Sequence, residues 1–365
     1  MMKRVRAFGS LAPLVLLLSA CASSSPAPAP GRSPAVAAEP EPQRVSLVCH
    51  EGSTAIRFDQ MGIPQGERPK AVAVHGDVTY VLFEPGRLAR ITRKEGKAQL
   101  EMSLAPPGET WTAMAVDPTD GSVWVSNERF ALVRFDRDWN AQAVKIKRVE
   151  GTGGFESLQV AADAIYAEPF CAEDGIWRLD RKGNILSSAF PVPPPDPAED
   201  RPVTMEELGV RCSPVRMERD PEGRIVVWDY ARRTLHQLDA QGAWTEVPST
   251  FFAALQVPTH EAGSVVKGAD VGGAREQWYL KIPARDLFYW KGQPVFFGGF
   301  TSQSRGLGQN TVLLRPRADA SGFDELIESC FGLGILDVAT DGPRYAAVTD
   351  KVVVFGDFAT APDLP

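Results

Sequence analysis

Short runs of apolar residues, separated by turns rich in Gly, Asp and Pro, follow one another through most of the chain. The clearest copy spans residues 113–136 and reads AMAVDPTDGSVWVSN, then ALVRFD after a short gap. This pattern predicts a strand, a polar turn at Gly121, a second strand, a loop, and a third strand that ends in an aspartate. Related copies cover residues 71–92, 157–180, 215–239 and 336–355.

Two landmarks recur in these copies in the same register. The first-turn position recurs at Gly121, Asp163 and Gly223, and the aspartate of the third strand recurs at Asp136, Asp180 and Asp239. The first steps are 42 and 44 residues long, and the following ones are lengthened by a proline-rich insert, residues 191–197. Short strands and turns that repeat at this spacing are typical of β-propeller blades. One blade cannot bury both of its faces, so we expect the copies to stack around an axis.

The segment DPTDGSVWVSN, with LVRFD after it, resembles the blade consensus of the NHL, SMP-30 and YVTN-type propellers. The resemblance covers roughly residues 45–357 and implies an all-β propeller of four-stranded antiparallel blades. A different antiparallel all-β fold is the alternative interpretation. We expect six blades, and their expected starts are Ala71, Ala113, Leu158, Pro214, Ser264 and Gly334.

The fifth blade is the least regular copy. We expect it to use residues 277–282, 286–290 and 294–297. Seven blades are the alternative, because residues 300–329 form a long stretch with little pattern, in which residues 324–329 (DELIES) predict a helical turn.

The last copy lacks a fourth strand after residues 351–355. We expect an N-terminal strand, at residues 45–48 or 54–58, to complete the last blade. Such a strand would close the ring and leave no open sheet edge.

The first residues of the chain form a targeting pattern. Three basic residues precede an apolar run at residues 7–18, which is too short to span a bilayer. The run ends in Leu18-Ser19-Ala20-Cys21, which resembles the lipobox of bacterial lipoprotein precursors. The resemblance implies a signal peptide at residues 1–20, acylation of Cys21, for instance by palmitate, and membrane attachment through that lipid. Ala22, in place of Asp, implies sorting to the outer membrane, with the domain facing the periplasm or the cell surface.

Residues 22–43 are almost entirely Ala, Ser, Pro, Gly and Glu, and such a segment cannot bury enough apolar surface to fold. Stretched out, it would reach roughly 60 Å as a tether. We therefore divide the chain into a signal peptide (1–20), the lipidated cysteine with its tether (21–43) and the propeller domain (44–360).

The net charge of the chain argues against one class of binding partner. Removal of residues 1–20 leaves 36 basic and 46 acidic residues, so the formal charge changes from −7 to −10. An acidic protein of this kind is a poor candidate for binding nucleic acid, which requires many Lys and Arg contacts to phosphate.

Four cysteines follow Cys21, and an even number in an oxidising compartment suggests disulfides. Three pairings are conceivable. We expect Cys171 to pair with Cys212, because both fall in loops on the same face of adjacent blades, and this leaves Cys49 with Cys330. Four unpaired, buried thiols are the alternative.

The loops that join successive blades share one face of a propeller with the loops between second and third strands. In such folds this face commonly carries the ligand site. It would suit a small polar or metal-bridged ligand, or it would simply be a solvated rim. The candidate residues on this face are Trp111, Asn127, Arg129, Glu156, Glu168, Arg211, Asp229, Tyr230 and Asp350.

No HExxH, GxSxG or GxxxxGK[ST] motif occurs. We therefore expect a scaffold without a cofactor and without catalysis, which binds an envelope protein or an extracellular or periplasmic ligand. The alternative comes from the SMP-30 resemblance, which implies a metal-dependent lactonase or a related propeller hydrolase or lyase, with a divalent cation such as calcium. The asparagines and the aspartate that this family places ahead of its inner strands are missing, and Glu67, Glu109 and Glu156 stand there instead.

Overall fold

The chain divides into two compact units, residues 1–41 and 42–365, and a computed structural model describes most of the second one. The described residues are 43–94, 97–147, 153–169, 175–189, 215–229, 234–239, 243–247, 265–267, 278–280, 286–301, 310–317, 323–328, 330 and 333–365. The expected lipidation site, Cys21, and the tether therefore lie outside the described residues. No helix among the described residues is long and apolar enough to cross a membrane.

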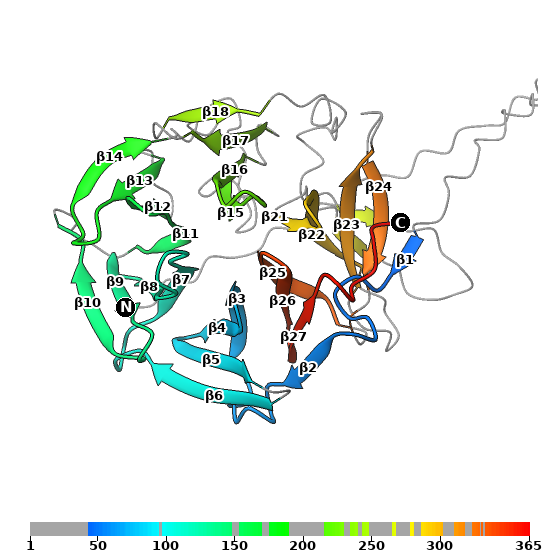
Figure 1. The fold of residues 1–365 in the computed structure, drawn as a ribbon, viewed down its shortest axis with the longest axis horizontal. Coiled ribbons are helices and arrows are strands. Elements are labelled where there is room, and N and C mark those ends of the chain that lie inside the picture. Colours follow the sequence, from blue (N-terminus) through cyan, green and yellow to red (C-terminus); the bar gives the residue numbers. More distant parts are fainter. Residues whose placement is uncertain are drawn as a thin grey trace, which may run out of the picture. The chain divides into compact units, whose positions relative to one another are not determined.

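The second unit is an all-β propeller of six four-stranded antiparallel blades (Figure 1). Blades one to three are β3 (Arg68–His75), β4 (Val78–Glu84), β5 (Arg87–Lys94), β6 (Lys97–Leu104); β7 (Trp111–Val116), β8 (Val123–Asn127), β9 (Ala131–Phe135), β10 (Ala141–Lys145); and β11 (Phe155–Val160), β12 (Ile165–Pro169), β13 (Ile176–Leu179), β14 (Ile185–Ala189). Blades four and five are β15 (Val215–Arg219), β16 (Ile225–Asp229), β17 (Thr234–Leu238), β18 (Trp244–Glu246); and β21 (Asp286–Trp290), β22 (Gln293–Thr301), β23 (Asn310–Pro316), β24 (Phe323–Glu328). Blade six is β25 (Ile335–Asp341), β26 (Arg344–Thr349), β27 (Val352–Asp357) and β2 (Thr54–Arg57).

The ring closes as expected from the short last copy. The N-terminal strand β2 pairs antiparallel with β27 and becomes the outermost strand of blade six. Of the two candidate segments, residues 54–58 therefore supply the missing strand. The other candidate overlaps β1 (Gln43–Val45), which runs parallel to β24 on the outer edge of blade five.

The landmark aspartates owe their register to a repeated turn. In Asp136, Asp180 and Asp239, the Oδ1 atom accepts a hydrogen bond from the backbone N–H four residues later, at 2.8, 2.8 and 2.9 Å respectively. This bond satisfies a backbone donor that the tight turn would otherwise leave without a partner, which explains why the same residue type recurs there. Gly121 and Gly223, in the first turns, adopt φ values of 69° and 80°, a region that favours glycine.

Apolar side chains fill each interface between neighbouring blades. The described residues form six buried clusters, one for each pair of adjacent blades around the ring. Trp124, Trp228 and Trp290 are buried in these clusters and pack between neighbouring blades. For example, the ring of Trp228 in blade four lies 4.7 Å from that of Phe296 in blade five.

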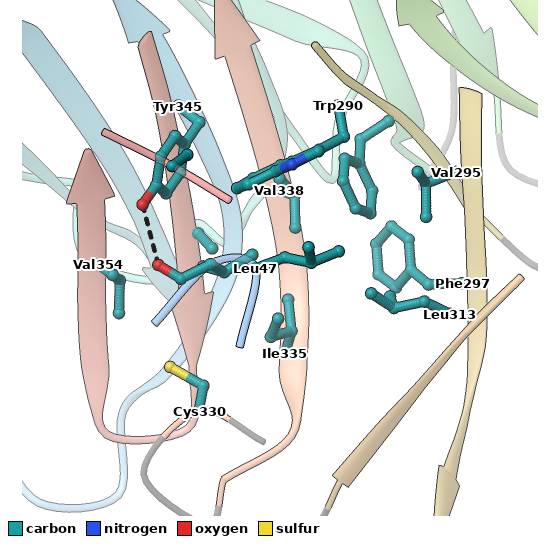
Figure 2. Packing of buried hydrophobic residues seen from close by; sticks show 14 of the residues in the cluster. Leu47, Trp290, Val295, Phe297, Leu313, Cys330, Ile335, Val338, Tyr345 and Val354 are labelled. Carbon is teal, nitrogen blue, oxygen red and sulfur yellow. Dashed lines mark hydrogen bonds between the residues drawn. The ribbon is translucent and has the colours of Figure 1, made fainter. Parts of the chain in front are cut away.

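The interface between blades five and six also receives both ends of the domain, and we call this region the closure seam: residues 45–50 and 358–364 with the side chains of β21 to β27 that they contact (Figure 2). The hydroxyl of Tyr345 donates to the carbonyl of Val48 at 3.0 Å, and Nε1 of Trp290 donates to the carbonyl of Pro362 at 3.0 Å. The seam thus ties the N-terminal and C-terminal segments to the same two blades.

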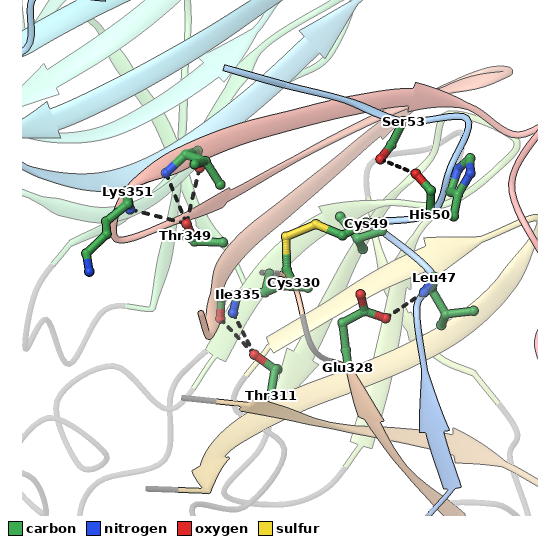
Figure 3. The surroundings of a disulfide bond; sticks show 12 residues. Leu47, Cys49, His50, Ser53, Thr311, Glu328, Cys330, Ile335, Thr349 and Lys351 are labelled. Atoms are coloured by element: carbon green, nitrogen blue, oxygen red, sulfur yellow. Dashed lines mark hydrogen bonds between the residues drawn. A yellow bond between two sulfur atoms is a disulfide. The ribbon is translucent and has the colours of Figure 1, made fainter. Parts of the chain in front are cut away.

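A disulfide joins Cys49 to Cys330 across the closure seam (Figure 3). This confirms the expected pair, which links the start of the domain to the connection into the last blade. Beside it, Oε2 of Glu328 accepts a hydrogen bond from the backbone N–H of Leu47 at 2.6 Å. The other expected pair, Cys171 with Cys212, lies outside the described residues.

Blade five differs from the expectation in two respects. Its innermost strand begins at Asp286, and its third and fourth strands come from the stretch that showed little pattern. Residues 278–280 form β20 (Trp278–Leu280), which pairs with β19 (Val265–Lys267) and with the end of β22. The expected helical turn at 324–329 is wrong, because residues 323–328 pair along their whole length with β23. Tertiary pairing here overrides the weak local preference of the DELIES sequence.

Candidate functional site

A cavity of about 330 Å³ lies where the six innermost strands begin, and we call it the channel cavity. These strands, β3, β7, β11, β15, β21 and β25, surround the centre of the ring (Figure 1). The volume falls at the lower end of the range for small-molecule pockets. The charged side chains of its lining are Lys70, Glu156, Arg216, Glu218, Asp286 and Asp337.

Three successive blades contribute carboxylates to one side of the channel cavity. They are Glu218 of β15, Asp286 of β21 and Asp337 of β25. Burial, together with the charges of Asp337 and Asp286, raises the pKa of Glu218 to about 8. Burial and the charge of Asp286 raise the pKa of Asp337 to about 7. Carboxyl groups of this kind hold a proton near neutral pH unless a positive charge approaches them.

Backbone contacts fix the position of these carboxylates. Asp337 accepts hydrogen bonds from the N–H of Val72 in blade one at 2.7 Å and from its neighbour Val338 at 2.9 Å. Oε1 of Glu218 accepts from the N–H of Arg219 at 2.9 Å. Asp337 therefore links the last blade to the first while it lines the cavity.

A second polar group lies at the junction of blades three and four. Oε2 of Glu168 is 3.9 Å from Nη1 of Arg216, which is too long for a hydrogen bond. Arg216 instead donates to the carbonyl of Val215 at 2.9 Å. Glu168 is 1% exposed, and neither carboxylate oxygen accepts a hydrogen bond from a described residue. Burial raises the pKa of Glu168 to about 8, although the positive charge of Arg216 opposes this rise.

Three of the candidate residues from the sequence gather at this end of the channel. Glu156 lines the cavity. Glu168 pairs with Ser157 and Asp229 pairs with Val215, and both of these partners lie at the start of an innermost strand. Arg211 and Tyr230 lie outside the described residues.

The other candidates have different surroundings. Trp111 is 1% exposed and packs its ring at 5.8 Å from Phe135, so it belongs to the apolar cluster between blades one and two. Asn127 is buried, donates to Glu109 and accepts two backbone N–H groups, which stabilise the turn that follows β8. Arg129 and Asp350 are exposed.

Most of the charged lining was missed by the sequence reasoning, which considered only loops. Lys70, Arg216, Glu218, Asp286 and Asp337 all lie on innermost strands. A signal for some of them exists in the sequence: Arg216 and Glu218 alternate with apolar residues in VRMER. Because alternate residues of a strand face opposite sides, this spacing indicates one polar and one apolar face.

Two of the three positions that the SMP-30 resemblance reserves for metal ligands are engaged in other contacts, and the third, Glu156, lines the channel cavity. Glu67 pairs with Arg87 at 2.7 Å, and Glu109 accepts a hydrogen bond from Asn127 at 2.9 Å. Within the described ranges, no group of three or more His, Cys, Asp or Glu side chains is arranged to hold a metal ion.

The sequence matches no known protein-family profile and no curated protein. Several solved structures of other proteins have a similar fold. A catalytically inactive virginiamycin B lyase from Staphylococcus aureus, with quinupristin, is 11% identical over 83% of this chain and 99% of that one, with a TM-score of 0.47. YCF48 bound to D1 peptide is 10% identical over 87% of this chain and 99% of that one, with a TM-score of 0.48. PorZ of the type-IX secretion system of Porphyromonas gingivalis is 12% identical over 82% of this chain and 38% of that one, with a TM-score of 0.43.

Proposed function

We propose that this protein is a lipid-anchored binding protein of the bacterial cell envelope, which holds a ligand or part of a partner protein in its channel cavity. The observation that carries the proposal is the lining of that cavity, where strands from different blades direct charged side chains at one volume. Burial of charged groups costs folding free energy, and groups with strongly shifted pKa values cluster at functional sites. The lining therefore has the features of a recognition site.

The position in the cell follows from the N-terminal sequence. Cys21 would carry the lipid, and residues 22–43 would let the propeller reach a partner at some distance from the membrane. With Ala22 after the acylated cysteine, the outer membrane is the proposed location. The partner would then be another envelope protein, or a ligand in the periplasm or outside the cell.

Photo-crosslinking in intact cells tests the binding function. In one variant a photoreactive residue replaces Lys70, which lines the channel cavity. In a matched control variant it replaces Lys94, an exposed residue at the end of β5 that is farther from the cavity. We expect adducts of discrete mass from the Lys70 variant and none of those from the Lys94 variant. Identical adduct patterns from both positions, or none from Lys70, would contradict a ligand in the channel.

A separate experiment tests the anchor. We expect the Cys21→Ser variant to leave the membrane fraction and to lose acylation in mass spectrometry of the intact protein. A variant that remains as firmly membrane-bound as the parent would contradict attachment through this residue.

A further inference from the structure

The lining of the channel cavity contains more carboxyl groups than basic groups. Its carboxylates are Glu156, Glu218, Asp286 and Asp337, and its basic side chains are Lys70 and Arg216. A positive charge that approaches these carboxyl groups favours their ionised form, and the low-dielectric walls strengthen the resulting attraction.

Both basic side chains also lie near carboxylates outside the lining. Nζ of Lys70 lies 3.4 Å from Oε1 of Glu84, and Nη1 of Arg216 lies 3.9 Å from Oε2 of Glu168. Among the described residues, no ion pair forms with the cavity carboxylates of Glu156, Glu218 or Asp337.

Arg219, next to Glu218, is a further positive charge among the described residues of this region. It interacts electrostatically with Asp117, Asp341 and Asp220 as well as with Glu218. Its positive charge therefore acts on four carboxylates, of which Glu218 lines the cavity.

Glu168 gives an independent indication of a ligand. Its carboxylate is almost completely buried, lies 3.9 Å from the cavity-lining Arg216, and accepts no hydrogen bond of normal geometry from a described residue, although the backbone N–H of Val215 stabilises its charged form. Burial of a hydrogen-bond acceptor without a well-aligned donor costs folding free energy. A cation close to Glu156 would repel the guanidinium of Arg216 toward Glu168, and the 3.9 Å separation would shorten to a hydrogen bond.

From this geometry we propose that the channel cavity selects an organic cation, an alkylammonium or alkylguanidinium group, as the ligand; this inference rests on the binding function proposed above. A group that carries several N–H donors on a short chain can contact carboxylates contributed by different blades. The volume of about 330 Å³ accommodates one amino-acid side chain or a small diamine.

This chemistry has two sources, a small free cation or a Lys or Arg side chain of a partner protein. Calorimetric titration of the full chain, purified in a non-ionic detergent, separates them. The small probes are agmatine and spermidine, and the peptide probe is N-acetyl-Gly-Arg-Gly-amide. Glutarate and the peptide with Gln in place of Arg are the anionic and neutral controls.

We expect at least one cationic probe to bind and both controls to fail. Tighter binding of the small cations would indicate a free ligand, and tighter binding of the peptide would indicate a side chain of a protein. Glu218→Gln should weaken the binding at least tenfold. Glu246→Gln is the matched control, since Glu246 is exposed on β18, the outermost strand of the same blade, and should bind like the parent.

Circular dichroism establishes that each variant is folded, and Asp286→Asn is a second cavity variant in case Glu218→Gln is not. The inference is overturned if no cationic probe binds, if a control binds as tightly, or if neither cavity variant weakens the binding. If the titrations overturn the cation inference but the Lys70 variant still forms crosslinked adducts, the proposed binding function stands and only the ligand class is wrong. If the Lys70 variant also forms no adducts, both the binding function and the cationic ligand are refuted.

Discussion

The closure seam and the channel cavity both contain carboxylates, but the polar groups of the two regions have different surroundings. In the seam, Glu328 accepts the N–H of Leu47 at 2.6 Å, and Tyr345 donates to the carbonyl of Val48. In the cavity region, Glu168 has no hydrogen-bond donor among the described residues. The polar groups of the seam tie the chain ends to blades five and six, whereas those of the cavity come from several blades and face one volume.

The two regions should therefore respond differently to mutation. Changes in the seam remove contacts that the fold needs, and stability should fall. Replacement of a cavity carboxyl group by its amide removes the cost of ionising it in the folded protein, so stability should rise at alkaline pH while binding is lost.

The largest expected effect is that of Trp290→Ala in the seam. The side chain is fully buried, contacts the rings of Phe288, Tyr345 and Phe358, and donates to Pro362. We expect a loss of about 3–5 kcal/mol in the free energy of unfolding, measured by urea denaturation. A loss below about 1 kcal/mol would show that the seam is not a principal stabilising interface.

The disulfide gives the next largest effect. Replacement of Cys49 and Cys330 by Ala opens a loop that spans 281 residues of sequence, and we expect a loss of about 2–4 kcal/mol. Urea denaturation without reductant measures it. Agmatine affinity should stay unchanged, because neither cysteine lines the cavity. A large loss of affinity would show that seam and cavity are coupled and would weaken the comparison.

The effect of Glu218→Gln has the opposite sign. The pKa of Glu218 is raised from 4.5 to about 8 in the folded protein. Between these pH values the folded state holds a proton that the unfolded state has lost, so this group lowers the free energy of unfolding as pH rises. The variant should lack that decrease and should exceed the parent by about 1–3 kcal/mol at pH 8. Parallel pH–stability curves for the two proteins would contradict a buried, protonated Glu218.

The smallest effect is expected at Arg129, a candidate from the sequence that the structure leaves exposed outside the cavity lining. Arg129→Ala should change the free energy of unfolding by less than about 0.5 kcal/mol. Agmatine affinity, measured by calorimetry, should equal that of the parent. A clear loss of affinity would extend the site from the channel to the rim.

The repeat was readable from sequence because its landmarks have local causes. Asp136 and Asp180 each bond to a backbone N–H only four residues away, so the same residue recurs at each copy. The N-terminal closing strand was predictable because an incomplete last blade needs a partner.

Features that depend on the closed ring were harder to predict. Blade five interrupts the repeat, so its strands at 310–316 and 323–328 had no local signature. The charged lining depends on which face of each innermost strand points to the axis, and this becomes known only when six strands are assembled. Trp111, a candidate for the surface, is buried because its neighbour blade covers it.

The ionisation of Glu218 tests the central claim, that the channel cavity retains carboxylates for a positively charged ligand. Carboxyl ¹³C NMR of the full chain, with the signal assigned by its absence in Glu218→Gln, gives this pKa directly. We predict a midpoint near pH 8 without agmatine and a shift to well below pH 7 with it. A midpoint near the ordinary value of 4.5, unchanged by agmatine, would contradict the claim.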